Sequence, residues 1–150
     1  MERKIREKFK YSWELKKLMY VRIELLRAFL IDDQHTPIAK RLFELKEKFV
    51  TSAATLIQLA HDLEEREKDL KLLSEVKKIK NFKVVPVDAN IIEEAIKWGK
   101  KYNLSIYDAI NVVTCLKLKE KMVTLETFFD KIPGIKREDP WKLVGVESQT

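Results

Sequence analysis

The chain has 150 residues, of which 45% are hydrophobic and 36% are charged, with a formal net charge of +6. This length fits one domain, and the composition excludes an intrinsically disordered chain. No apolar run approaches the roughly 20 residues of a membrane-spanning helix, and the charged N-terminus has no apolar signal core, so we expect a cytoplasmic protein outside any membrane. The single cysteine, Cys115, excludes an internal disulfide and suits a reducing compartment.

Helical and strand patterns alternate along the chain. We expect helices over residues 1–18, 24–31, 36–48, 53–66, 68–79, 88–102, 105–119 and 126–131. We expect strands over residues 19–23, 49–52, 82–87, 122–125 and 134–136. Helices that alternate with strands imply βαβ units. The sequence therefore predicts an α/β fold with three layers, α/β/α, around a central, mostly parallel sheet of four or five strands.

Several residues refine the expected ends and buried faces of these elements. Thr36 is expected to cap the helix that Pro37 begins. Pro86 lacks an amide hydrogen, which predicts that the third strand lies at an edge of the sheet or ends there. The residues predicted to face inward on the helix at 88–102 are Ile92, Ala95 and Ile96.

The pattern divides the chain into three parts. Residues 1–18 form an N-terminal helical extension with Phe9 and Trp13 on one stripe, residues 19–137 form the main domain, and residues 138–150 form a tail that Trp141 and Leu143 are expected to anchor. The extension either packs on its own domain or covers a partner surface. A second copy of the chain is one such partner, and we expect a homodimer.

The positive charge is concentrated in two runs. The denser run contains Lys77, Lys78, Lys80 and Lys83, and the second contains Lys97, Lys100 and Lys101. Such runs belong either to a solvated surface or to a surface that binds nucleic acid. RNA is therefore one candidate partner.

The stretch 105–135 resembles the C-terminal half of a PIN domain, the small α/β nuclease fold of VapC-type toxins. In that family a helix that opens with Tyr-Asp-Ala carries one metal-binding carboxylate, and Asp108 stands at that position. A following strand that ends in Val-Thr-x-Asp carries another, and here Glu126 follows Thr124. The resemblance spans residues 19–135, and its C-terminal third is the most specific part.

The resemblance implies metal-assisted hydrolysis of RNA, in which Mg²⁺ or Mn²⁺ activates a water and neutralises charge on the phosphate. Hard divalent ions prefer oxygen ligands, which in a parallel α/β fold gather at the carboxyl ends of the strands. Asp108 and Glu126 are the candidate catalytic and metal-binding residues, and Thr124 is a candidate supporting residue. If the site is degenerate, no cofactor is implied.

Two acids of the family pattern are replaced. Arg22 stands where the first strand of the family carries an acid, and Gln58 stands at the second acid. A guanidinium about 4 Å from a divalent ion opposes binding by several kcal/mol, since unit charges at that distance interact by about 4 kcal/mol at an effective dielectric near 20. We therefore expect weakened or lost metal binding. We also expect the Arg22 guanidinium to pair with Asp108, Glu126 or both, because its fork of donors suits carboxylates.

Glu24 offers an alternative third acid. It lies two residues after Arg22, and on a strand such residues share a face. Glu24, Asp108 and Glu126 would then form a rearranged catalytic and metal-binding set.

Each candidate residue also has an ordinary structural interpretation. Asp108 follows Ser105 by three residues, as in a helix cap. Glu126 opens a short helix, where a carboxylate complements the helix dipole. Gln58 and Thr124 fit a polar surface and a strand equally well, and His35 and His61 lack the spacing of a metal site.

Three functions follow from these readings. The first is a degenerate PIN-domain protein that binds RNA or an antitoxin-like protein. The second is an active Mg²⁺- or Mn²⁺-dependent endoribonuclease, the toxin of a toxin–antitoxin pair. The third is an α/β interaction module without nuclease ancestry. The pair Arg22 and Gln58 favours the first function, whereas Glu24 favours the second.

Overall fold

The computed structural model describes residues 18–145, so nearly all of the helix expected over residues 1–18, and residues 146–150, lie outside the described residues. Five strands form one sheet: β1 (Leu18–Val21), β2 (Lys48–Ser52), β3 (Phe82–Val85), β4 (Lys121–Val123) and β5 (Arg137–Glu138). Their order is β3-β2-β1-β4-β5, and every pair is parallel. The predicted parallel α/β architecture is confirmed. Every strand therefore ends at the same edge of the sheet.

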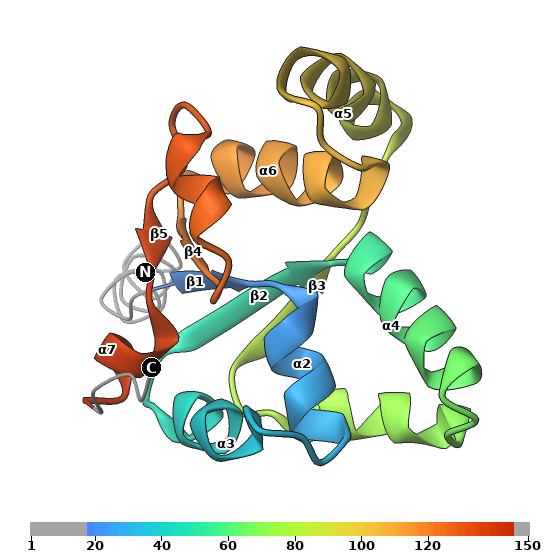
Figure 1. Ribbon diagram of the computed structural model, residues 1–150, viewed down its shortest axis with the longest axis vertical. Helices are drawn as coiled ribbons and strands as arrows, with labels where there is room; N and C mark the ends of the chain where they lie inside the picture. Colours follow the sequence, from blue (N-terminus) through green and yellow to red (C-terminus); the bar gives the residue numbers. More distant parts are fainter. Residues whose placement is uncertain (1–17, 146–150) are drawn as a thin grey trace, which may run out of the picture.

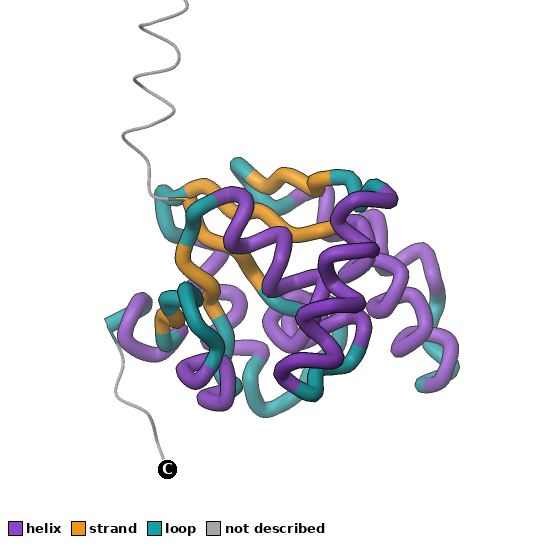
Figure 2. The backbone as a smooth tube through the Cα atoms, turned by 90° about the horizontal axis from the view of Figure 1, so that it is seen from above, coloured by secondary structure: helices purple, strands orange, loops and turns teal. Residues whose placement is uncertain are grey.

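Helices cover both faces of this sheet (Figure 1). The helices are α2 (Ile23–Leu30), α3 (Thr36–Glu44), α4 (Ala53–Glu65), α5 (Ala89–Tyr102), α6 (Ile106–Leu118) and α7 (Pro140–Leu143), and the 3₁₀ helices are η1 (Leu70–Lys78) and η2 (Thr127–Lys131). α5 and α6 lie above the sheet in Figure 1, and α2 and α3 lie below it. Figure 2 shows the same backbone from above, with the strands short and the helices forming most of the fold.

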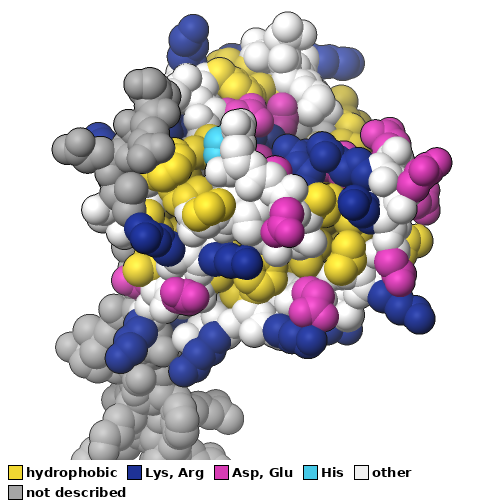
Figure 3. All heavy atoms as spheres, turned by 60° about the horizontal axis from the view of Figure 1, so that its bottom comes forward, with side chains coloured by type: hydrophobic (Ala, Val, Ile, Leu, Met, Phe, Trp, Pro, Cys, Tyr) yellow, Lys and Arg dark blue, Asp and Glu magenta, His cyan; other side chains and the backbone are white. Residues whose placement is uncertain are grey.

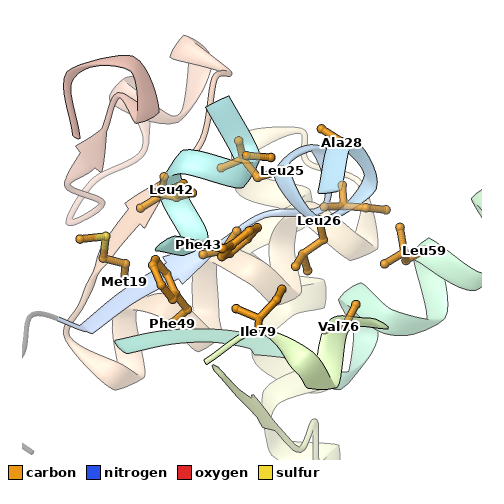
Figure 4. Packing of buried hydrophobic residues seen from close by; sticks show 14 residues of the cluster. Met19, Leu25, Leu26, Ala28, Leu42, Phe43, Phe49, Leu59, Val76 and Ile79 are labelled. Carbon is orange, nitrogen blue, oxygen red and sulfur yellow. The ribbon is translucent and has the colours of Figure 1, made fainter. Parts of the chain in front are cut away.

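The alternation of side chains along β1 divides the core between the two faces. Met19 and Val21 belong to a cluster with α2, α3 and η1, whereas Tyr20 belongs to a cluster with α6, β4 and η2. In the first cluster, the Phe43 ring makes T-shaped contacts with the Phe29 and Phe49 rings at centroid distances of 5.4 and 5.1 Å. Figure 4 shows Phe43 beside Phe49 in this cluster. A parallel sheet buried on both faces explains why the strands are almost continuously apolar.

Some predicted boundaries differ from the structure. The fifth strand occupies residues 137–138 instead of 134–136, because Gly134 has a φ of +84° and turns the chain there. The helix expected over residues 36–48 ends at Glu44, and Lys48 already belongs to β2. β3 is an edge strand and Pro86 follows it directly, as predicted.

The predicted inward face of α5 is wrong for two residues. Ala95 is fully buried, but Ile92 and Ile96 are 41% and 47% exposed. α5 packs against α6 through the side that carries Ala95, Ile91 and Trp98. The helical spacing identified an apolar helix, but a helix covered on one side buries only part of its apolar residues.

One of the two predicted helix caps is present, and the other is not. The Ser105 hydroxyl accepts a hydrogen bond from the Asp108 amide at 3.1 Å, which fixes the start of α6. Thr36 is not a cap, because it lies inside the first turn of α3 and its hydroxyl donates to the Ala28 carbonyl at 2.7 Å. That bond ties α3 to α2.

The end of the described chain packs on the domain. Asp139 caps α7 by accepting from the Trp141 amide at 2.9 Å, Pro140 is buried, and Leu143 packs against the cluster of Met19 and Phe43. Among residues 18–145, no helix has the length and apolar character needed to cross a membrane.

Candidate functional site

Arg22 lies where β1 meets α2, at the carboxyl edge of the sheet. β1 ends at Val21, and Arg22 has extended backbone angles (φ −86°, ψ 169°) and precedes the first turn of α2. Its side chain is 3% exposed, and its guanidinium carbon lies 4.4 Å from the centre of the Phe129 ring. Burial and the aromatic face hold the guanidinium in one place.

Three carboxylates surround this guanidinium. Nη2 of Arg22 lies 2.5 Å from Oδ1 of Asp108, and Nη1 lies 2.9 Å from Oε1 of Glu126 and 3.5 Å from Oε2 of Glu24. The three acids come from α6, the loop after β4, and α2, so one side chain links three segments of the carboxyl edge. The pairing of Arg22 with both Asp108 and Glu126, expected from the sequence, is present. We call these four residues the arginine–carboxylate cluster.

The starts of three helices bring these acids together. Asp108 lies in the first turn of α6, Glu24 lies in the first turn of α2, and Glu126 directly precedes η2. Helix N-termini carry a partial positive charge that favours carboxylates. Asp108 and Glu126 are therefore both helix-start residues and members of the cluster.

Glu24 reaches the cluster by a different route from the one predicted. The expectation that it shares a strand face with Arg22 is wrong, because the strand stops at Val21 and Glu24 belongs to a helix. Its Oε1 accepts hydrogen bonds from the Thr124 hydroxyl and from the Leu125 amide, the latter at 3.1 Å. Thr124 is fully buried and also accepts from the Glu126 amide at 3.1 Å. Thr124 therefore orients both acids.

The charges in the cluster reinforce one another. Burial alone would lower the pKa of Arg22, but the carboxylates of Glu24, Asp108 and Glu126 together outweigh it, so its pKa is raised. One guanidinium and three carboxylates carry a formal net charge of −2. The exposed fraction of the acid side chains rises outward, from 9% for Glu24 to 22% for Asp108 and 47% for Glu126. The buried end of the cluster is neutralised, and the open end is acidic.

Some polar atoms at this buried end have no hydrogen-bond partner among the described residues. They are Nε and Nη1 of Arg22 and Oε2 of Glu24, although Nη1 makes the ion pairs given above. On α4, Oε1 of Gln58 is also buried without a partner. Among residues 18–145, Gln58 makes no hydrogen bond to Arg22. No hydrogen bond therefore joins Gln58 to the arginine of the cluster. His61 is exposed on the same helix.

A buried hydrogen-bond network behind the cluster fixes α6, which carries Asp108. Oδ1 of Asn111 accepts from the hydroxyls of Tyr20 and Thr55, the latter at 3.1 Å, and its amide donates to the Tyr107 carbonyl at 2.9 Å. Burial raises the pKa of Tyr20 to about 12, despite the neighbouring hydroxyls of Ser52 and Thr55, which lower it. The network links β1, α4 and α6.

The sequence reasoning missed two parts of the site. One is Phe129, whose ring covers the guanidinium. The other is Asn111, which lies three residues after Asp108 and is 1% exposed. A buried polar residue on an otherwise apolar helix was the signal that could have identified it.

The cluster does not fit a divalent cation as it stands. Among the described residues, no group of three His, Cys, Asp or Glu side chains is placed to hold a metal ion. Asp108 and Glu126, the two acids that match the metal ligands of the family, both face the guanidinium. Mg²⁺ needs carboxylate oxygens that converge on the ion, and here they converge on a cation of the chain.

Comparison with known proteins gives the same fold. VapC20 of Mycobacterium tuberculosis, a toxin that cleaves the sarcin–ricin loop, aligns with a TM-score of 0.67 at 19% identity, over 77% of this chain and 95% of that chain. A toxin–antitoxin complex from Klebsiella pneumoniae aligns with a TM-score of 0.62 at 17% identity, over 81% and 97%. VapBC2 from Rickettsia felis, bound to a fragment of its promoter DNA, gives 0.63 at 15% identity, also over 81% and 97%. Comparison with curated proteins gives no match.

The sequence profile of the PIN domain matches residues 25–135. This match begins just after Arg22 and Glu24, and it includes Gln58, Asp108 and Glu126. The resemblance read from residues 19–135 is confirmed, and the interpretation as an unrelated α/β module is wrong. The chain belongs to the PIN domain family and has the fold of the VapC toxins.

Proposed function

We propose that this VapC-related PIN-domain protein acts by binding a macromolecular partner and no longer cleaves RNA with a metal ion. The observation that carries the proposal is the Arg22 guanidinium, which lies 2.5 Å from Asp108 and 2.9 Å from Glu126. A divalent ion that took the same acids would meet this fixed positive charge. Each unit of charge about 4 Å away opposes it by about 4 kcal/mol at an effective dielectric near 20.

The same geometry makes displacement of Arg22 by a metal ion unfavourable. The side chain is 3% exposed and packs on Phe129, so leaving the cluster would expose an apolar contact as well as break three ion pairs. Glu24 is held by Thr124 and Leu125 and stays in place beside it. Metal-dependent chemistry therefore has no free set of ligands in this conformation.

A protein of the antitoxin class is the partner that we propose first. Solved structures with this fold include toxin–antitoxin complexes from Klebsiella pneumoniae and Haemophilus influenzae. RNA and a second copy of the chain are further binding partners within the same proposal, and the net charge of +6 is compatible with RNA. A cytoplasmic location, in keeping with the single cysteine, is part of the proposal.

One observation favours a second function, an active endoribonuclease that uses Mg²⁺ or Mn²⁺. Glu24, Asp108 and Glu126 all lie within 3.5 Å of the same guanidinium, so they would form a three-acid set if Arg22 moved away. Catalysis in this form requires a second conformation of Arg22.

The test is cleavage of a mixed single-stranded RNA in the presence of Mn²⁺, with Asp108→Asn and Glu24→Gln as matched controls. Each control removes one charge and keeps the shape of the side chain. We expect the same background signal from all three folded proteins. Cleavage by the wild type that both controls abolish would replace the binding proposal with the nuclease.

A further inference from the structure

A pocket opens at the amino edge of the sheet, where the parallel strands begin, on the side that α6 covers. It has a volume of about 400 Å³ and lies between the end of α6, the starts of β1 and β4, and the turn before β5. The arginine–carboxylate cluster lies at the other edge, because Arg22 follows the end of β1 and Asp108 lies in the first turn of α6. The pocket is therefore separate from the cluster that carries the proposed function.

The inner wall of the pocket is apolar and chemically inert. Leu18 and Leu116 are half-buried there and pack against the buried cluster of β1, β4 and α6. Cys115 is fully buried in the same wall, its thiol donates to the Glu120 carbonyl at 3.1 Å, and burial raises its pKa to about 12. Because the thiol stays neutral at physiological pH, the wall offers apolar contact without a charge or a nucleophile.

A glycine leaves space beside this wall. Gly134 lines the pocket with a φ of +84°, and a Cβ atom at this position would come within 3.0 Å of Cδ2 of Leu116. A larger residue at position 134 would therefore occupy part of the pocket or displace Leu116, and the glycine avoids both.

The rim of the pocket is basic, and two of its charges are free. Lys119 and Lys136 are exposed and make no ion pair within residues 18–145, whereas Lys121 binds Glu138 at 2.9 Å. Lysine and arginine side chains are scattered over the face that Figure 3 brings forward, next to acidic and apolar ones, so exposed positive charge alone does not mark a site. The pocket differs because its free lysines border a half-buried apolar wall.

The acid on the lining weakens the positive potential without cancelling it. Burial raises the pKa of the Glu120 carboxyl, and the nearby Lys48, at the start of β2, opposes that rise. The lining contains three lysines and one glutamate, which carry a formal net charge of +2. A ligand with a negative charge is therefore the one that this pocket favours.

The shape of the lining selects the rest of the ligand. Among the described residues, no aromatic side chain lines the pocket, so a nucleotide base would have no ring on which to stack. Leu18 and Leu116 suit an aliphatic body instead. The volume lies within the usual range of about 300–1,000 Å³ for a small-molecule site, near its lower end.

We propose that this pocket binds a small aliphatic carboxylate. Its carbon chain would lie against Leu18 and Leu116, and its carboxylate would accept charge-assisted hydrogen bonds from Lys119 and Lys136. The inference goes beyond the macromolecular partner proposed above and does not depend on it, because it concerns a different surface and a different class of ligand.

The test is a titration of the ¹⁵N-labelled full chain with octanoate, followed by amide chemical shifts. We expect the shifts to centre on Leu116, Lys119, Gly134 and Lys136, with a dissociation constant of about 1 mM or lower, as ligands of this size can reach. Octan-1-ol has the same carbon chain without the charge. It should bind at least about fivefold more weakly, because it cannot pair with the two lysines.

Charge removal at the rim supplies the matched variants. Lys119→Gln with Lys136→Gln should weaken octanoate binding by about fivefold or more, whereas Lys119→Arg with Lys136→Arg should keep it within about twofold. Lys97→Gln with Lys100→Gln makes the same change of net charge on α5 and should alter binding by less than about twofold, since neither residue lines the pocket. Because all of these lysines are exposed, we expect each variant to keep the dispersed amide spectrum of the folded chain.

Four outcomes would overturn the proposal. They are absence of octanoate shifts at the pocket, equal affinity for octanoate and octan-1-ol, equal loss of binding in both glutamine variants, and inorganic phosphate binding at the same residues as tightly as octanoate. The last outcome would make the lysines an anion site without a place for an aliphatic body. None of them bears on Mn²⁺-dependent cleavage, which tests the function of the Arg22 site separately.

Discussion

The two edges of the sheet are built from opposite kinds of side chain. At the carboxyl edge, three acids enclose one buried guanidinium, and the ion pairs are closed within the chain. At the amino edge, lysines line the rim of a pocket with an apolar wall, and Lys119 and Lys136 make no ion pair within residues 18–145. Charges that satisfy one another stabilise the fold, whereas charges without partners are available to another molecule. The two edges therefore differ in whether their charges are paired within the described part of the chain.

Removing the guanidinium should have the largest effect on stability. In Arg22→Ala, Glu24 would stay buried at 8% exposure beside two further carboxylates without their counterion. Breaking a buried ion pair from one side costs about 3–5 kcal/mol, and we expect about 3 kcal/mol because Glu126 is half exposed. Urea unfolding measures the loss.

Arg27→Ala is the matched control for this variant. Arg27 pairs with Asp62 at 2.7 Å, but the two side chains are 28% and 23% exposed. Solvent screens this pair, so its loss should cost about 1 kcal/mol or less. Equal losses of stability in the two variants would mean that the ion pairs of Arg22 contribute no more than an ordinary surface ion pair.

Reversing the charge at position 22 should convert the cluster into a site that binds a divalent cation. In Arg22→Asp, four carboxylates would face one another, and we expect Mn²⁺ to raise the melting temperature. At about 100 times the dissociation constant, the stabilisation would be about 2.7 kcal/mol. The wild type should show no such rise in the same calorimetric titration. A rise of equal size in the wild type would show that Arg22 does not block the metal.

The Thr124 hydroxyl tests how firmly the acids are positioned. Thr124→Val would leave Oε1 of Glu24 without one of its two hydrogen bonds, at a cost of about 1–2 kcal/mol. Thr114→Val is an isosteric control on α6, because the buried Thr114 hydroxyl has no hydrogen-bond partner among the described residues. The control should be neutral or stabilising when unfolding is followed by circular dichroism. Similar losses in both variants would rule out a positioning role for Thr124.

Tyr20, between the two edges, should give the smallest effect at neutral pH, because its contribution changes only above about pH 10. Its pKa is raised to about 12 by burial, above the usual value of about 10 for tyrosine, so the folded state favours the neutral phenol. The stabilisation is complete below about pH 10 and is lost as the pH rises from about 10 to about 12, with roughly 1 kcal/mol gone halfway. Comparison with Tyr20→Phe by urea unfolding isolates this term. An unchanged difference between the two proteins across that range would contradict it.

The fold was more predictable from the sequence than the site. Strand and helix patterns identify elements because burial on both faces of a parallel sheet makes the strands apolar throughout. The same patterns failed at Ile92 and Ile96, since spacing alone does not say whether a neighbour covers a helix face. The fifth strand was predicted at the wrong residues because Gly134 lies in a turn. From the sequence alone, a glycine fits a turn and the start of a strand equally well.

Within the site, the contact of Arg22 with Asp108 and Glu126 followed from counting charges at matched positions. The route of Glu24 did not, because the end of β1 at Val21 turns a strand position into a helix position. The cover by Phe129 also escaped, since a core phenylalanine and a ring above a cation look identical in sequence. Contacts that depend on where an element ends require the three-dimensional structure.

The buried guanidinium is a cation that does not have to be taken up from the surroundings. A metal-ion site is complete only when the surroundings provide the ion, so its occupancy varies with ion concentration and chelators. Arg22 is synthesised with the chain and is present once in every molecule. We therefore expect the contact between the start of α2 and the start of α6 to be the same in magnesium-rich and magnesium-starved conditions, and to be unchanged by chelators.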